Sequence, residues 1–292
     1  MADQRQDERT KEVRRTVPPS DEEHRTLRRD HPLEESRKSY HTILEQQIEE
    51  AEEELDRPSM ALLLSGLAAG LDLGFGPFAM AVNSTLTKEV FARPVQELLN
   101  ANLYAVGFIF VVLGRSALFT EHTTTAVLPL LARRKSVPAL FRLWGLVLLA
   151  NVVGAALFAW GAAVLGPALG VAEPSVFGEM ARRMVDKPTG ATLLSAVGAG
   201  WLMGLLAWLT TSTRDTISQI VVVWLTTMVI GLAGLHHSIA GTVEVLLGVF
   251  SGVGATLADY GRFLLWAVLG NVIGGAGFVA LLKYAHVRQS AE

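Results

Sequence analysis

The sequence predicts an all-α membrane protein in which six transmembrane helices form two inverted three-helix repeats, with the second and fifth helices interrupted. Three observations lead to this prediction. Charge is concentrated in the first 58 residues, where 28 positions are charged, against 25 of the remaining 234. The remainder contains long charge-free runs at 143–172, 188–213, 216–243 and 263–282. Polar, glycine-rich interruptions also occur at matching places in the two halves of this apolar region.

The composition narrows the possible classes of function. Each charge-free run is long enough to cross a hydrocarbon layer of about 30 Å as a helix of about 20 residues. A soluble helix would instead alternate polar and apolar faces. The chain contains no cysteine, which excludes a disulfide framework and any cysteine-ligated metal. No basic stripe is interleaved with aromatic residues, so nucleic acid is not an expected partner. The expected partner is a lipid bilayer.

Residues 1–58 are predicted to form a charged cytoplasmic tail. Residues 1–38 have the composition of a disordered segment. Residues 39–57 instead carry apolar side chains at spacings of three and four, which predicts an amphipathic helix. The helix could lie on the membrane surface or dock on a partner subunit. Its polar face is acidic, and this disfavours binding to anionic lipid, so we expect the apolar stripe to dock on protein of a partner subunit. The stripe consists of Tyr40, Ile43, Leu44, Ile48, Ala51 and Leu55.

Residues 59–285 are predicted to form the six-helix transmembrane channel domain, followed by a short cytoplasmic C-terminus at 286–292. The first segment is expected to end before Asn83. The second and fifth segments are too long for one straight crossing. Positive residues are balanced between the loops on the two sides, and the basic residues of the tail place both termini in the cytoplasm. The six expected segments are 59–82, 98–132, 137–165, 189–212, 216–250 and 258–285.

The two halves of the apolar region resemble each other. The run that begins at Asn151 matches the run that begins at Asn271, and the run Ser65–Gly70 matches the run Ser195–Gly200. Each half contains three crossings, so the repeats are inverted relative to each other in the membrane. Inverted repeats with interrupted helices at corresponding places indicate a transport path near the bilayer midplane.

The interruptions contain most of the candidate functional residues. Unpaired backbone is costly in hydrocarbon, so such breaks persist only where they line a cavity or are buried in protein. Ionisable residues at this depth are functional candidates by default. The breaks lie in 114–125 and in 231–241. The deep ionisable candidates are Asp72, Arg115, Glu121, His122, His236, His237 and Glu244.

Several of these residues also have a structural interpretation. Arg115 and Glu121 could form a buried ion pair, and Asp72 could bond to a neighbouring helix. Adjacent histidines on a helix diverge by about 100°, so we expect at most one of His236 and His237 to be central.

Catalysis is not predicted. The chain has no H-E-x-x-H motif and no G-x-S-x-G motif, so an intramembrane metalloenzyme is only a minor alternative. We expect no catalytic residue, no metal site and no cofactor.

The motifs at the two breaks resemble those of the formate/nitrite transporter family. They are Leu118-Phe119-Thr120 and His237-Ser238-Ile239-Ala240, and the resemblance extends over 59–285. The sequence is most similar to the YfdC-like branch of this family, because of its long charged tail, the Thr-Glu-His that includes His122 and the His-His pair. The resemblance implies an aquaporin-like protomer assembled as a homopentamer in the bacterial inner membrane, with one pore per protomer.

The resemblance also implies roles for residues. Leu118 and Phe119 would form an apolar constriction, and Thr120 would approach the central histidine, His237. A small weak-acid monovalent anion would then pass with participation of a proton at that histidine. Protonation of the anion removes its charge, and a bare charge in low dielectric is very costly. Histidine is a suitable proton donor because its side chain titrates near neutrality.

This sequence departs from the family pattern at several positions. Ser195 stands where members of the family typically carry a lysine, and the loss of that positive charge disfavours anion entry. Glu121 adds a negative charge. Two alternatives therefore remain: a channel for a neutral or cationic small solute, and a non-transporting structural or regulatory membrane protein. The other departures are Ala117, Gly200, His236 and Gly241.

Overall fold

The computed structural model describes residues 38–290, so the predicted disorder of residues 1–37 lies outside the described residues. The chain divides into a short unit at 1–39 and a second unit that begins at Tyr40. Within the described part of this second unit, every regular element is a helix. The predicted all-α fold is confirmed.

Six spans in the described residues are long and apolar enough to cross a membrane. The first consists of α4 (Ser59–Leu73) and α5 (Phe75–Thr87). The second, third, fourth and fifth are α6 (Arg93–Leu113), α9 (Val137–Ala168), α11 (Thr189–Ser212) and α12 (Thr216–Ala233). The sixth consists of α14 (Leu257–Val272), the π-helix η1 (Ile273–Ala280) and α15 (Leu281–Gln289). The chain is therefore a multi-pass membrane protein.

Shorter helices complete the two interrupted segments. α6 is followed by a break and by α7 (Phe119–Thr125) and α8 (Leu128–Leu131). α12 is followed by a break and by α13 (Ser238–Phe250). The helix α10 (Pro174–Val185) lies between the third and fourth spans. The interruptions expected in 98–132 and 216–250 are thus present.

Two predicted boundaries were wrong. The first span continues through Asn83 to Thr87, because the Asn83 side chain donates a 2.8 Å hydrogen bond to Asn100 Oδ1 on α6. The amide is thereby satisfied inside the helix pair, and it does not end the helix. The sixth span continues to Gln289, so residues 286–289 of the expected C-terminal tail are helical.

Glycines allow the spanning helices to cross closely. A Cβ added to Gly70 would overlap the backbone oxygen of Asn151, where α4 crosses α9. A Cβ added to Gly200 would overlap the backbone oxygen of Asn271, where α11 crosses α14. Small residues of this kind are typical of helix contacts in membranes. The two crossings occupy matching places in the two halves.

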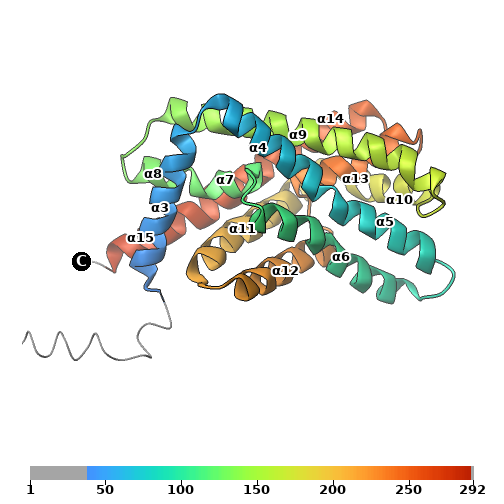
Figure 1. Cartoon of the computed structure of the whole chain (residues 1–292), viewed down its shortest axis with the longest axis horizontal. Helices are drawn as coiled ribbons and strands as arrows, with labels where there is room; N and C mark the ends of the chain where they lie inside the picture. Colours follow the sequence, from blue (N-terminus) through green and yellow to red (C-terminus); the bar gives the residue numbers. More distant parts are fainter. Residues whose placement is uncertain (1–37, 291–292) are drawn as a thin grey trace, which may run out of the picture. The chain divides into compact units, whose positions relative to one another are not determined.

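The amphipathic helix α3 (Tyr40–Asp56) runs across one end of the spanning helices (Figure 1). Its buried side chains Ile43, Leu44 and Ile48 join Leu128 and Val287 in one apolar cluster. Arg134 Nη2 lies 2.7 Å from Glu45 Oε1 and strengthens this contact from the polar side. The apolar stripe thus docks on protein, but on the chain's own channel domain and not on the partner subunit that the sequence led us to expect.

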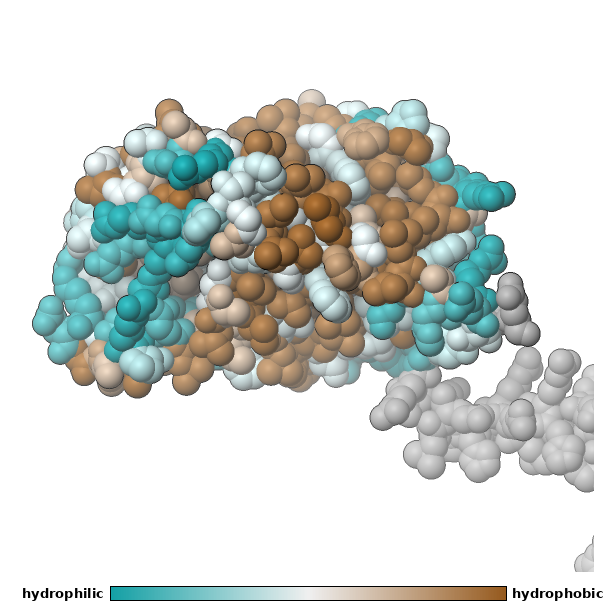
Figure 2. Space-filling view, turned by 180° about the vertical axis from the view of Figure 1, so that it is seen from behind, coloured by the Kyte–Doolittle hydropathy of each residue, from teal (hydrophilic) through white to brown (hydrophobic). Residues whose placement is uncertain are grey.

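The outer surface has the polarity of a membrane protein. The face shown in Figure 2 carries an apolar belt between two hydrophilic ends. Leu149, Leu157 and Val164 of α9 are among the large apolar side chains that are exposed. Such an extensive apolar surface is not stable in water and indicates contact with lipid or with other subunits.

Candidate functional site

The two interrupted helices stop in the same way. α6 ends at Leu113, and Arg115 then adopts a left-handed conformation with φ of 51°. α12 ends at Ala233, and Gly234 adopts φ of 61°. A left-handed residue just past the last turn is a common helix stop, usually provided by glycine. Arg115 lacks the conformational freedom of glycine, so its left-handed backbone conformation costs roughly 1–2 kcal/mol.

The first break is held by Asn151 of α9. Its Oδ1 accepts a hydrogen bond from the backbone N–H of Phe119 at 2.8 Å. Its Nδ2 donates to the backbone oxygens of Gly66 and Ala117, at 2.8 and 2.9 Å. This amide therefore satisfies backbone groups that the interruption leaves unpaired inside the apolar body.

The second break is held by Asn271 of α14 in the same manner. Its Oδ1 accepts from the backbone N–H of Ser238 at 2.8 Å. Its Nδ2 donates to the backbone oxygens of Ala196 and His236, at 2.8 and 3.0 Å. The agreement with Asn151 in all three bonds supports the predicted internal repeat.

The two breaks meet at Thr120 and His237. Thr120 Oγ1 lies 2.8 Å from His237 Nε2, and both side chains are fully buried. His237 is also the N-cap of α13, because its Nδ1 accepts from the backbone N–H groups of Ile239 and Ala240, at 3.3 and 3.2 Å. An accepting Nδ1 carries no proton, so the neutral ring holds its proton on Nε2. Nε2–H then donates to Thr120 Oγ1, and the Thr120 hydroxyl proton is left to donate elsewhere.

Apolar side chains surround this contact. The Phe108 ring meets the His237 ring edge-on, with their centroids 5.0 Å apart. Leu118 belongs to the same buried cluster as Phe108. Phe119 instead belongs to a second cluster, and its ring centroid lies 6.3 Å from that of Trp144 on α9. Leu118 and Phe119 thus pack in different clusters, and the expectation that both form the constriction stays a prediction.

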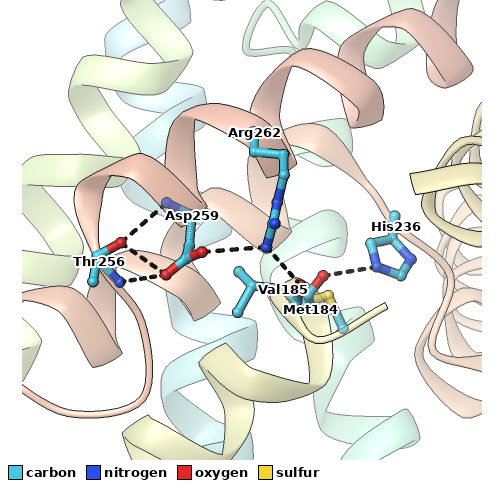
Figure 3. Close-up of polar contacts among 6 residues, drawn as sticks. All are labelled: Met184, Val185, His236, Thr256, Asp259 and Arg262. Carbon is cyan, nitrogen blue, oxygen red and sulfur yellow. Dashed lines mark hydrogen bonds and ion pairs between the residues drawn. The ribbon is translucent and has the colours of Figure 1, made fainter. Parts of the chain in front are cut away.

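His236 faces away from Thr120 and has structural partners. Its Nδ1 lies 2.8 Å from Ser195 Oγ. Its Nε2 lies 3.0 Å from the backbone oxygen of Met184 (Figure 3). Arg262 donates to the next carbonyl, that of Val185, at 3.2 Å. Unpaired carbonyls at a helix C-terminus need such donors, so His236 and Arg262 together complete the end of α10. Only one of the two histidines is central, as expected, although both lie in the non-helical break.

Ser195 lies beside the second break. It contacts His236 and accepts from the His236 backbone N–H at 3.0 Å. Ser65 makes the matching contact in the first half, where its Oγ accepts from the Ala117 backbone N–H at 2.9 Å. Both serines thus brace the backbone of a break.

A cavity of about 290 Å³ lies between α3, the end of α6 and α7. Arg115, Glu121 and His122 line it, so three of the predicted residues are gathered here. Arg115 is exposed, and among the described residues it forms no ion pair with Glu121. The interpretation of these two residues as a buried ion pair is therefore wrong.

Asp72 does not join the other candidates. It is partly exposed on α4, it does not line this cavity, and no described residue forms a hydrogen bond with its carboxylate. The expected bond from Asp72 to a neighbouring helix is not formed. Glu244, in contrast, is buried on α13.

Sequence reasoning assigned no role to Asn151, Asn271 or Phe108. The two asparagines could have been found, because each is a polar residue in a long charge-free run at the same offset from a break. Phe108 carried no such signal. Within residues 38–290, no three histidine or acidic side chains are grouped so that they could hold a metal ion.

The sequence model of the formate/nitrite transporter family matches residues 41–285. The chain belongs to this family. It is 33% identical over 242 residues to the inner membrane protein YfdC of Escherichia coli (strain K12), covering 82% of this chain and 76% of that protein. It is 26% identical over 246 residues to the formate channel BtFdhC of Bacillus thuringiensis, covering 83% of this chain and 93% of that protein.

A solved structure shares the fold. It is described as a pentameric formate channel with formate bound, and the TM-score is 0.65 at 21% identity. The match covers 79% of this chain and 98% of that one. The membership of the family and the YfdC-like character expected from the motifs are confirmed.

Proposed function

We propose that the protein is a membrane channel or transporter for a small weak-acid monovalent anion such as formate or nitrite, with participation of a proton at His237. The observation that carries this proposal is the 2.8 Å contact between Thr120 Oγ1 and His237 Nε2, which joins the two helix breaks inside the apolar body. Relatives described as a formate channel and as nitrite transporters support the choice of substrate class.

The Thr120 hydroxyl is the group that would meet the anion. Because Nε2–H of His237 donates to Thr120 Oγ1, the hydroxyl hydrogen is free to donate to a carboxylate or nitrite oxygen. Phe108 and Leu118 keep this place apolar. A bare anion is costly in such surroundings, and protonation to the neutral acid removes most of that cost.

The hydrogen-bond pattern of His237 defines how a proton can take part. Uptake of a proton at Nδ1 gives the imidazolium and breaks the two bonds from Ile239 and Ala240. Loss of an N-cap costs roughly 0.5–2 kcal/mol. The positive charge is also costly in these apolar surroundings, and the entering anion offsets that cost. The Nε2 proton then moves to Thr120 Oγ1 while the hydroxyl proton moves to the anion. The products are the neutral acid, an intact Thr120 and a neutral ring protonated on Nδ1.

We further propose a homopentamer in the bacterial inner membrane, with one pore per protomer and both termini in the cytoplasm. The pentameric assembly of the similar formate channel supports the first part. The concentration of basic residues in the tail supports the orientation.

A second candidate is a channel for a neutral or cationic small solute. The acidic wall of the cavity near Glu121 favours it, because carboxylates at the entrance repel anions and attract cations. Ser195 also provides no positive charge near the breaks.

Flux into proteoliposomes separates these functions. The purified protein is reconstituted and offered formate, nitrite, hydrosulfide, ammonium and glycerol, with empty liposomes as the control. We expect formate or nitrite to enter fastest. Entry of ammonium or glycerol alone would replace the first candidate with the second, and the absence of any flux above the control would exclude transport.

A further inference from the structure

The cavity beneath α3 has an unusual wall. On one side α3 contributes Gln47, Glu50, Glu53 and Glu54, and on the other α7 contributes Glu121 and His122. The volume of about 290 Å³ is much larger than the roughly 30 Å³ that one water occupies in the liquid. A small hydrated ion or amine therefore fits inside.

The described part of this wall carries more carboxylates than guanidinium groups. Glu53, Glu54 and Glu121 line the cavity together with Glu50, which has an interaction of its own, and the lining guanidinium among the described residues is that of Arg115. Arg57 lies outside the lining and holds Glu54 at 2.8 Å. The field inside therefore favours a cation.

Two buried polar side chains of the wall lack partners. His122 is 7% exposed, and neither of its ring nitrogens has a hydrogen-bond partner among the described residues. Gln47 is 2% exposed, and its Nε2 is likewise unpaired there. Buried polar atoms are nearly always paired, so groups of this kind indicate something that binds to them. Both side chains line the acidic cavity.

We propose that this cavity binds a small monovalent cation with N–H donors, of the ammonium or primary-amine class. The carboxylates of Glu53 and Glu121 accept N–H groups, and the unpaired nitrogen of a neutral His122 accepts a further one. No three histidine or acidic groups in residues 38–290 are close enough to ligate a metal ion directly, which argues against a divalent metal.

The site has a direct consequence for an anion that enters from this end. A bound cation cancels part of the negative charge that Glu121 and the α3 carboxylates place in its path. The cavity would then act as a cation-dependent entrance. Binding is measured without flux, so this proposal stands or fails separately from the proposed transport of anions.

The test uses the purified full-length protein in detergent. The NMR line width of isotope-labelled ammonium reports binding, because exchange with a large complex broadens the line. We expect Glu121→Gln to weaken ammonium binding about tenfold, since one nearby charge is removed from a partly hydrated site. Arg115→Met is expected to strengthen it by a similar factor, because the opposing charge is lost.

The matched control is Glu49→Gln. Glu49 lies on α3 but outside the cavity lining, so its variant is expected to bind ammonium as the wild type does. Glu53→Gln serves as a second cavity variant if Glu121→Gln fails to elute as a folded oligomer.

Three results would overturn the proposal. The first is equal ammonium binding by the cavity variants and the control. The second is displacement of ammonium by magnesium at much lower concentration, which would show a divalent metal site. The third is binding of formate that is lost in Arg115→Met, which would show that Arg115 makes this an anion site.

Discussion

Asn151 and Asn271 hold the two helix breaks with the same three hydrogen bonds, one accepted from a backbone N–H and two donated to backbone oxygens. Each asparagine comes from a different span than the break it supports. The polar interruptions can therefore exist inside an apolar body because a fixed amide replaces the water that would otherwise pair their backbone.

Asn271→Ala is expected to destabilise the protein strongly. The substitution leaves the backbone N–H of Ser238 and the backbone oxygen of His236 without their partner, whereas the oxygen of Ala196 keeps its bond within α11. Each buried group left unpaired costs about 1–3 kcal/mol. The measurement is the thermal unfolding midpoint of the detergent-purified protein. Asn102→Ala is the control, because Asn102 is partly exposed and its bonds, from Trp224 Nε1 and to the Leu98 oxygen within α6, do not hold a helix break. Equal midpoints for the two variants would contradict the role of Asn271.

Thr120→Val is expected to reduce formate flux at least about tenfold, whereas Thr120→Ser is expected to retain it. Valine has nearly the shape of threonine but leaves Nε2–H of His237 unpaired and offers the anion no donor. Serine keeps the hydroxyl. Initial rates in proteoliposomes give the comparison. Equal rates for the valine and serine variants would show that the hydroxyl takes no part.

Substitutions at Arg115 and at Gly234 are expected to change the stability of the protein in opposite directions. Arg115→Gly removes a left-handed strain at φ of 51° and is expected to raise stability by up to about 1 kcal/mol. Gly234→Ala introduces a Cβ at φ of 61°, where no atom lies within 4 Å, so its cost is backbone strain alone, again about 1 kcal/mol. Unfolding midpoints measure both changes. A loss of stability in Arg115→Gly would show that the guanidinium contributes more than the strain costs.

The ion pair between Lys88 and Glu173 is expected to give a pH-dependent stability. Lys88 Nζ lies 2.6 Å from Glu173 Oε2, outside the membrane spans, and lowers the pKa of that carboxyl below its ordinary value of 4.5. A lowered carboxyl pKa stabilises the folded state above the ordinary value, and the contribution is lost as pH falls through the lowered one. Lys88→Met should therefore lower the unfolding midpoint at neutral pH but not in strong acid.

The control for this ion pair is Lys187→Met. Lys187 is exposed and forms no ion pair among the described residues, so its variant is expected to match the wild type at every pH. A difference between wild type and Lys88→Met that persists unchanged into strong acid would contradict the assignment.

Much of the fold could be predicted because membrane insertion acts on local sequence. The charge-free runs identify spans, and the polar breaks stand out in them. Asn83 was misread because its partner, Asn100, lies on another span, and no local pattern reveals that pairing. The direction of Phe119 likewise depends on packing against Trp144.

The candidate site was predicted in part. The pairing of Thr120 with His237 was expected from the family motifs and is present in the structure. The cavity beneath α3 was not foreseen, since it depends on where an amphipathic helix docks. That docking places Gln47 and His122 on the wall of one cavity, although the two residues are far apart in the chain.

The most direct test of the account is the pH dependence of formate flux in His237→Asn proteoliposomes. Asparagine is a good N-cap, so the start of α13 is kept while the titratable ring is removed. His236→Asn is the control, because His236 bonds to the end of α10. We predict that wild-type and His236→Asn flux rises as the pH falls, and that His237→Asn flux is at least about tenfold lower and independent of pH. Wild-type rates and pH dependence in His237→Asn would contradict the central role of this histidine.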